Sequence, residues 1–169
     1  MKISLVVAAD LKNGIGRNNQ LMWKLPADMD WFKEQTIGHH VLMGKNTYLS
    51  IPPKFRPLPD RVNMVVSRSM LPEEGVYIFD SISTAVSFAN TNEEDKLCVI
   101  GGAMVYRESL DLADEIILTR VQHTFEEADV FFPEFRDKGW QRIFHKTRLK
   151  DERNAYSMEF EIWQKDTQN

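Results

Sequence analysis

The sequence has a single cysteine, Cys98, and no hydrophobic run long enough to cross a bilayer. One cysteine excludes an internal disulfide, and its apolar neighbours predict that it packs as a small hydrophobic residue in a reducing compartment. The most apolar N-terminal stretch, residues 3–9, is too short for a membrane span and lacks the pattern of a signal peptide. We therefore expect a cytoplasmic protein that does not bind membranes.

Positive charge is not in excess, because 21 Lys and Arg stand against 25 Asp and Glu, giving a formal net charge of −4. Such a surface repels phosphodiester backbones, so no nucleic-acid partner is expected. The four histidines lack the i, i+4 spacing and the cysteine pairs typical of metal sites, and no serine lies in a G-x-S-x-G motif. The sequence therefore disfavours a metal site and a serine hydrolase.

The 169 residues, of which 43% are hydrophobic, correspond to one domain with a substantial core. Short β-branched runs alternate with amphipathic stretches, which predicts an α/β fold with a largely parallel sheet. Helices are expected at residues 27–36, 46–51, 83–90 and 103–110. Strands are expected at residues 2–9, 40–43, 61–66, 76–79, 96–100, 115–121, 141–149 and 155–164, and the last two should form an antiparallel pair.

The segment from residue 44 to residue 69 has an unusual composition. Four of the seven prolines lie between Pro52 and Pro59, which predicts a stiff, extended loop over residues 51–59. One acid, Asp60, accompanies five basic residues: Lys45, Lys54, Arg56, Arg61 and Arg68. This local excess of positive charge indicates an anionic ligand, although a solvated basic face would have the same composition.

Three expected strands end in residues suited to phosphate binding. They lead into Gly44-Lys45-Asn46-Thr47, into Ser67-Arg68, and into Gly101-Gly102 before a helix that begins near Ala103. Glycine lets a phosphate approach the N–H groups of a helix N-terminus, and the carboxyl ends of parallel strands meet at one crevice. Each stretch alone could be a structural turn. Together they favour a dinucleotide whose 2′-phosphate is bound by Ser67 and Arg68.

Asp28 is an acid in apolar surroundings. Helical spacing places it on one face with Trp31 and Phe32, whereas Asp30 points away. A desolvated carboxylate needs donor groups, so a ligand with paired N–H donors would suit it, although a first-turn Asp can also simply face the helix dipole. Phosphate sites beside a shielded aromatic pocket with one acid indicate hydride transfer and not hydrolysis.

Residues 14–33, which include Trp23-Lys24-Leu25-Pro26-Ala27-Asp28, resemble the N-terminal signature of dihydrofolate reductases. Four further blocks, at residues 41–48, 56–61, 99–106 and 127–133, follow in the order of that family and extend the match over nearly the whole chain. The resemblance implies a single α/β domain, residues 1–169, with a central, mostly parallel eight-stranded sheet flanked by helices. It also implies NADPH-dependent reduction of 7,8-dihydrofolate to tetrahydrofolate, which supplies one-carbon metabolism.

The resemblance also implies roles for individual residues. Asp28 would pair with the pterin ring nitrogen and 2-amino group, assisted by Thr119, and would act with Trp23 and Tyr106 as the catalytic set. The folate site would comprise Val6, Ala8, Asp28, Met29, Phe32, Lys33, Ile51, Arg56, Leu58, Arg61, Ile100 and Thr119, with Arg61 on the glutamate carboxylate. The cofactor site would comprise Ala8, Ile15, Gly16, Asn19, Leu21, Gly44, Lys45, Asn46, Thr47, Ser67, Arg68, Ile100, Gly101, Gly102, Ala103 and Tyr106.

The sequence departs from the family pattern in a few places. Met22 stands where proline is usual, Asp60 and Ala128 replace frequent glycines, and extra residues follow Ile51. A monomer that binds dihydrofolate and folate analogues, without a metal, is expected. Two alternatives are a reductase of another pterin-like or pyrimidine substrate, which would be expected to lose the pairing of Asp28 and Arg61, and a non-catalytic NADPH-binding module.

Overall fold

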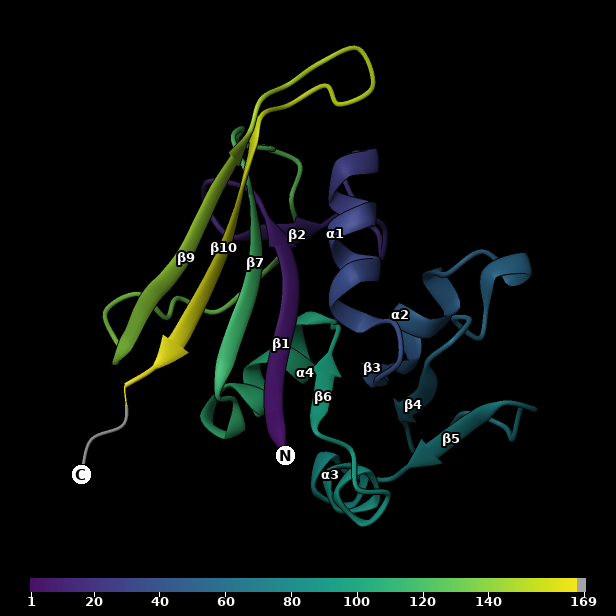
Figure 1. The fold of residues 1–169 in the computed structure, drawn as a ribbon. Helices are drawn as coiled ribbons and strands as arrows, with labels where there is room; N and C mark the ends of the chain where they lie inside the picture. The colour runs from purple at the N-terminus through teal and green to yellow at the C-terminus, as the bar shows by residue number, and fades with distance from the viewer. Residues whose placement is uncertain (167–169) are drawn as a thin grey trace.

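The computed structural model describes residues 1–166. Eight strands form one sheet in the order β5-β4-β3-β6-β1-β7-β10-β9, and β2 and β8 pair separately (Figure 1). The strands are β1 (Lys2–Ala9), β2 (Gly14–Gly16), β3 (His40–Gly44), β4 (Val62–Val66), β5 (Val76–Phe79), β6 (Lys96–Val99), β7 (Glu115–Val121), β8 (Val130–Phe131), β9 (Trp140–Arg148) and β10 (Met158–Lys165). The helices are α1 (Pro26–Thr36), α2 (Lys45–Ser50), α3 (Ile82–Thr91) and α4 (Ala103–Ser109), with short 3₁₀ turns at Pro53–Phe55 and Leu110–Leu112.

Strand β1 lies inside the sheet and pairs in parallel with β6 and with β7. Its residues alternate between the two faces, as the 2-residue period of a strand requires. Val6 packs in a core cluster with Tyr48 of α2, against which Trp31 and Phe32 of α1 also pack. Leu5 and Val7 belong to the cluster of α3 and α4. Helices α1 and α2 therefore cover one face of the sheet and α3 and α4 the other.

The predicted fold class is confirmed, including the antiparallel pairing of β9 with β10 at the end of the sheet. Cys98 is fully buried in β6, as predicted, and burial raises the pKa of its thiol to about 12. Within residues 1–166, no helix is long and apolar enough to span a membrane.

Some expected boundaries were wrong. Strand β10 begins at Met158 and not at residue 155, because Asn154 closes a turn by hydrogen bonding to Asp151 and also accepts the N–H of Ala27 at the start of α1. Strands β2 and β8 were missed because segments of three and two residues carry no readable period.

The proline-rich loop differs from its prediction as well. Residues 53–55 form a 3₁₀ turn, so the loop is not extended throughout. The guanidinium of Arg56 donates to the carbonyl oxygens of Leu49 and Ile51, both at 2.9 Å, and so folds the loop back towards α2.

Glu94 joins the amino ends of β3 and β6. Its carboxylate accepts the N–H groups of His40 at 2.8 Å and of Asp95 and Lys96 at 3.0 Å, and it contacts the rings of His39 and His40. Burial raises the pKa of Glu94, but the hydrogen bonds outweigh burial and lower it from 4.5 to about 2.

We expect Glu94→Gln to lower the free energy of unfolding at neutral pH by about 1–2 kcal/mol, since it weakens charge-assisted hydrogen bonds that water partly screens. A depressed native pKa stabilises the fold above the unfolded pKa. The difference from wild type should therefore shrink as pH falls from about 4.5 to about 2. Urea unfolding across this pH range measures it, with exposed Glu108→Gln as the control. A difference that is independent of pH would contradict this account.

Candidate active site

Asp28 lies in the first turn of α1, which begins at Pro26, a residue suited to that position because the N–H it lacks has no partner there. Its side chain turns into the protein and only 7% of the residue is exposed. Burial raises the pKa of Asp28, and the Thr119 hydroxyl and the Trp23 indole offset part of that rise. No cationic group contributes to this balance. Asp28 is therefore a buried acid without a compensating charge.

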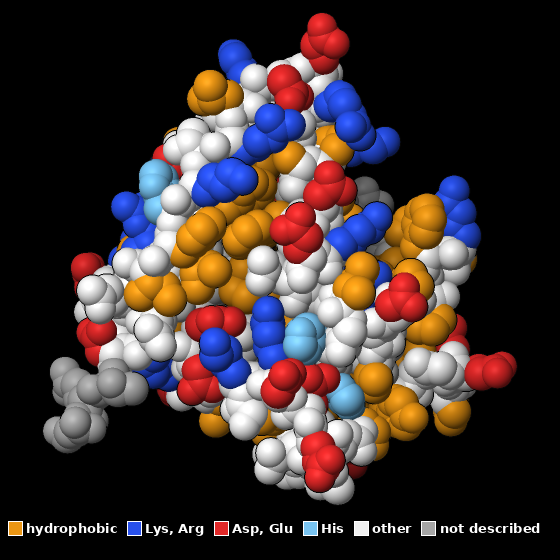
Figure 2. Space-filling model, viewed as in Figure 1, with side chains coloured by type: hydrophobic (Ala, Val, Ile, Leu, Met, Phe, Trp, Pro, Cys, Tyr) orange, Lys and Arg blue, Asp and Glu red, His pale blue; other side chains and the backbone are white. Residues whose placement is uncertain are grey.

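Aromatic side chains pack between α1 and the β9–β10 pair, one turn beyond Asp28. Trp31 of α1 stacks on Phe160 of β10 at 4.8 Å between ring centroids and on Phe144 of β9 at 6.0 Å. Figure 2 shows hydrophobic side chains gathered over this region, between the β9–β10 pair and α1. Asp28 is thus buried one turn before Trp31, whose ring packs against the sheet.

Trp23 and Thr119 come from different elements to the same acid. Thr119 of β7 pairs with Ala8 of β1, and Trp23 packs against Phe125 with ring centroids 5.4 Å apart. The Trp23 indole nitrogen is buried and lies close enough to Asp28 to lower the pKa of that carboxyl, but no group among the residues described accepts its hydrogen with good geometry. Since buried donors are normally satisfied, this N–H calls for a water molecule or a ligand at the site.

The loop from Gly14 to Leu25 is fixed at several points. The carboxylate of Asp10 accepts the N–H groups of Gly14 at 2.7 Å and of Phe125 at 2.9 Å. Asp129 accepts the N–H of Asn18 at 3.0 Å, and the Asn19 amide donates to the carbonyl of Asn46 in α2 at 3.0 Å. The loop thus connects the surroundings of Asp28 to the start of α2.

Two of the departures from the family pattern fall in or beside this loop. A Cβ at Gly14 would lie 2.9 Å from the Cβ of Ala128, so the alanine at 128 is tolerated because residue 14 is glycine. Met22 is half-buried beside the cluster that contains Trp23 and Leu25.

The three strand ends predicted to bind phosphates lie side by side. The N–H of Gly44, the last residue of β3, donates to the carbonyl of Gly101, after β6, at 2.9 Å. The Lys45 ammonium donates to the Ser69 hydroxyl, after β4, at 3.2 Å. A Cβ at Gly102 would lie 3.3 Å from the Thr47 hydroxyl, so glycine keeps open the space beside this side chain. The resulting cradle of N–H groups, hydroxyls and cations fits the phosphates of a dinucleotide.

Tyr106 stands behind this cradle. Its hydroxyl donates to the carbonyl of Val6 at 2.6 Å, and a Cβ at Gly101 would lie 3.3 Å from its ring. Burial, and then the charge of Asp28, raises the pKa of the Tyr106 hydroxyl far above its usual range. Tyr106 therefore stays neutral and holds the end of β1 against the Gly101 turn.

Arg61 lies at the opposite end of α1 from Asp28. Its Nε donates to the Pro59 carbonyl at 2.8 Å, its Nη1 to the Thr36 hydroxyl at 3.1 Å, and its guanidinium lies 6.0 Å above the ring of Phe32. Asp60, just before it, has a φ of 60°, a conformation that glycine adopts more easily and that accounts for the frequent glycine at this position. Four residues predicted for the folate site are half-buried or exposed, namely Met29, Phe32, Ile51 and Leu58.

Two contacts were missed by the sequence reasoning. The Ser69 hydroxyl accepts a hydrogen bond from the Lys45 ammonium. The sequence feature that could have indicated this contact is Ser67-Arg68-Ser69, directly after a strand. Asp129, which accepts the N–H of Asn18, lies in the family block of residues 127–133, but the sequence analysis gave it no role. The structure also brings one ligand atom each of His39, Glu94 and Asp95 within 4.8 Å of one another. The sequence spacing had disfavoured such a histidine cluster. The contacts among these residues belong to the Glu94 hydrogen-bond network described above.

Comparison with known proteins decides the family. The family model described as dihydrofolate reductase matches residues 2–165. The chain belongs to the dihydrofolate reductase family. It is 41% identical to the dihydrofolate reductase of Haemophilus influenzae over 162 residues, with 96% of this chain and 98% of that one covered. It is 37% identical to that of Bacillus subtilis over 164 residues, with 96% and 94% covered.

The solved structures give the same result. A dihydrofolate reductase from Enterococcus faecalis, complexed with NADP(H) and RAB-propyl, superimposes with a TM-score of 0.89 at 29% identity and covers 98% of this chain and 97% of that one. The predicted family, fold and activity are therefore confirmed, and the chain is an oxidoreductase that uses NADPH to reduce dihydrofolate. The two alternative functions have no support in these comparisons.

Proposed function

We propose that the groove beside α1 binds the pterin ring of 7,8-dihydrofolate, with Asp28 paired to a ring nitrogen and the 2-amino group. This proposal rests on the buried carboxylate of Asp28, for which residues 1–166 provide no cationic partner. A bound pterin would supply the paired N–H donors that this carboxylate needs, and Thr119 would assist from β7.

Asp28, Trp23 and the loop from Gly14 to Leu25 would control protonation of the pterin and the access of water to it. The raised pKa of Asp28 suits a group that favours protonation at N5 of the pterin near neutral pH. The free indole N–H of Trp23 would order a water molecule or the substrate above this acid. The loop from Gly14 to Leu25 would close over the reacting atoms and exclude bulk water.

The cofactor would lie along the cradle formed by the ends of β3, β4 and β6. The groups proposed to hold its phosphates are those of Gly44, Lys45, Asn46, Thr47, Ser67, Arg68, Gly101, Gly102 and Ala103. Ala8, Ile15, Gly16, Asn19, Leu21, Ile100 and Tyr106 would surround the remainder. NADPH, when bound, supplies the hydride that is added at C6 of the pterin.

At the far end of the groove, Arg61 would bind the glutamate carboxylate of folate, with Lys33 and Arg56 near it. Two hydrogen bonds already hold the guanidinium of Arg61 in place, so its remaining N–H groups would bind a carboxylate at little further entropic cost. We further propose a cytoplasmic, monomeric enzyme in which residues 1–169 form one domain and no nucleic acid is bound. The buried, unpaired Cys98 and the net negative charge support this proposal.

We expect Asp28→Asn to lower kcat/KM for dihydrofolate at neutral pH by about 100-fold or more, because it removes the charge that favours a protonated pterin. The loss should be smaller in acid, where substrate arrives protonated. Because a buried charge is removed, the free energy of unfolding should not fall, which separates this effect from misfolding. The exposed Asp30→Asn on the same helix is the matched control. A wild-type pH profile for Asp28→Asn would refute the proposed role.

A second test concerns cofactor choice. If Lys45 and Arg68 bind a 2′-phosphate, replacing both with alanine should reduce the preference for NADPH over NADH by about 10-fold or more, since each charge-assisted contact contributes about 1.5–3 kcal/mol. The measurement is kcat/KM with each cofactor, and Lys54→Ala, in the same basic segment, is the control. An unchanged ratio in the double variant would exclude these residues from the phosphate site.

A third test concerns the tail of the substrate. Arg61→Ala should raise KM for dihydrofolate by about 10-fold or more through loss of a charged hydrogen bond, and should leave KM for a dihydropteridine without the glutamate nearly unchanged. Equal losses for the two substrates would indicate a disturbed fold in place of a lost carboxylate contact.

A further inference from the structure

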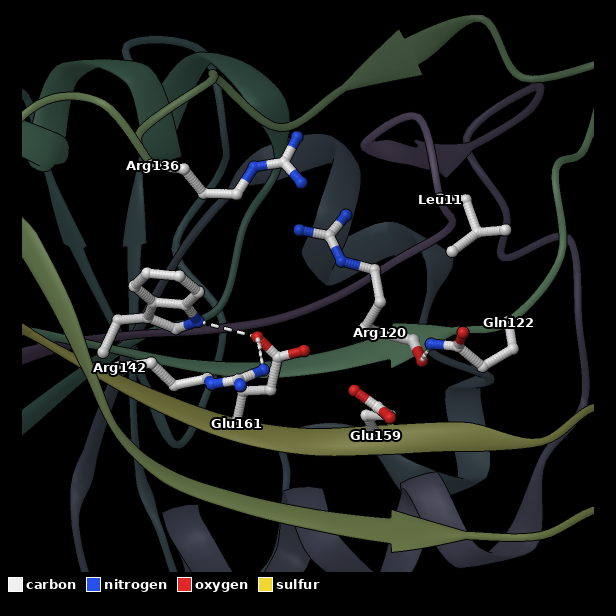
Figure 3. Close-up of a pocket in the computed structure, with 8 residues that line it drawn as sticks. Leu11, Arg120, Gln122, Arg136, Arg142, Glu159 and Glu161 are labelled. Atoms are coloured by element: carbon white, nitrogen blue, oxygen red, sulfur yellow. Dashed lines mark hydrogen bonds and ion pairs between the residues drawn. The ribbon is translucent and has the colours of Figure 1, made fainter.

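A second hollow, of about 650 Å³, lies on the face of the sheet opposite α1 (Figure 3). Thr119 and Phe160 point to the α1 side, so the alternation of β7 and β10 turns Arg120, Glu159 and Glu161 to the other side. The hollow is therefore separated from the candidate active site by the thickness of the sheet.

Charged side chains line this hollow, and most of them are already paired. Arg142 of β9 lies 4.0 Å from Glu161, and the imidazole of His145 lies 2.9 Å from Glu159. Arg136, from the loop between β8 and β9, binds Glu134 through two hydrogen bonds of 2.9 and 2.8 Å.

Arg120 differs from the other two arginines. It is only 6% exposed, yet no carboxylate of residues 1–166 lies within 4.0 Å of its guanidinium. Glu159 stands directly opposite it in the strand register but is turned to His145. Burial and then the charge of Arg136 lower the pKa of Arg120. The charges of Glu161, Glu134 and Asp10 oppose that effect, but none of them forms an ion pair with Arg120. Arg120 therefore carries the charge in this hollow that is left without a carboxylate partner.

The hydrogen bonds of Arg120 leave one edge of its guanidinium open. Its Nη1 donates to the carbonyl of Asp10 and to the side-chain oxygen of Asn13, both at 2.7 Å. Nη1 has two hydrogens, so these two bonds use both. Nε and Nη2 donate to no group in the described part of the chain, and their hydrogens form the parallel pair that binds two oxygens of one anion.

The close-up shows where this open edge would meet a ligand. The guanidinium groups of Arg120 and Arg136 point toward one another across the hollow, whereas Arg142 and Trp163 turn to Glu161 on its floor (Figure 3). Arg136 is half-exposed and can contribute a further hydrogen bond without losing its partner Glu134.

We propose that this hollow is a binding site for a small oxyanion, held by the Nε and Nη2 of Arg120 and by Arg136. The ligand class is a carboxylate or phosphate group with two oxygens free to accept parallel hydrogen bonds. Such a ligand would neutralise the unpaired buried cation, which is costly to leave uncompensated. Arg120 also holds Asp10 and Asn13, so the bound anion would support the turn that leads from β1 into β2.

Inorganic phosphate is the probe for the first experiment. The protein is loaded with saturating NADPH, so that the proposed cofactor cradle is occupied, and phosphate is exchanged for chloride at constant ionic strength. The readout is the Nε–Hε resonance of Arg120 in a ¹H–¹⁵N spectrum, assigned by its absence from Arg120→Lys. We expect a saturable shift of this resonance, and a second titration with malonate distinguishes carboxylates from phosphates as the preferred class.

Three variants test the assignment through the midpoint of thermal unfolding as a function of phosphate. Arg120→Lys keeps the charge but lacks the paired donors, and should lose the saturable stabilisation. Arg136→Gln should weaken phosphate binding by about 10-fold. Because Arg136 is exposed, this variant should fold and keeps the test valid even if Arg120→Lys does not fold. Arg148→Gln removes an equally exposed arginine outside the hollow and should bind phosphate like wild type.

A linear drift of the Arg120 resonance without saturation would overturn the proposal, as would equal phosphate affinity in Arg136→Gln and wild type. Binding is measured without dihydrofolate and without turnover. Failure of the proposed substrate site would therefore show in the kinetics of Asp28→Asn and Arg61→Ala and not in these titrations.

Discussion

The parallel pairing of β1 with β6 on one side and β7 on the other positions the candidate active site and the hollow on the opposite face of the sheet. The register places Ala8 opposite Thr119, and β10 continues it by placing Phe160 opposite Thr119. A slip of one residue would exchange the two faces. Thr119 would then leave the side of Asp28, and Arg120 would be driven into the aromatic cluster under α1. The fully buried Leu5, Ile116 and Leu118 hold this register by packing in the core cluster with α3 and α4.

Asp28 shows the usual opposition between stability and chemistry at an enzyme site. A buried carboxylate without a cation weakens the fold of the empty protein, because Thr119 and Trp23 offset only part of its desolvation. In the proposed site, the pterin would remove this penalty by bringing its own donors, so binding and the relief of desolvation would be the same event.

The sequence predicted those parts of the molecule that depend on local pattern. The β-branched run of residues 2–9 and the spacing of Asp28, Trp31 and Phe32 are read directly from neighbouring residues, and both are confirmed. The family resemblance added Thr119, which no local pattern connects with Asp28. The start of β10 was placed wrongly because Asn154 is recruited by α1, more than 100 residues earlier in the chain. The unpaired charge of Arg120 could not be predicted from the sequence either. It depends on Glu159 pairing with His145 of the neighbouring strand β9, which is a tertiary contact.

The burial of Cys98 has a practical consequence for the study of loop closure. Its Sγ faces the carbonyl of Gln35 at 3.5 Å inside a strand that is paired on both sides, and its raised pKa keeps it a thiol at neutral pH. Thiol reagents attack the thiolate of an accessible cysteine, so this side chain is inert towards them. The chain therefore has no reactive cysteine that would compete with an engineered one for a label. A single engineered thiol such as Asn19→Cys would take one fluorophore or spin label, at the tip of the loop that bridges to α2.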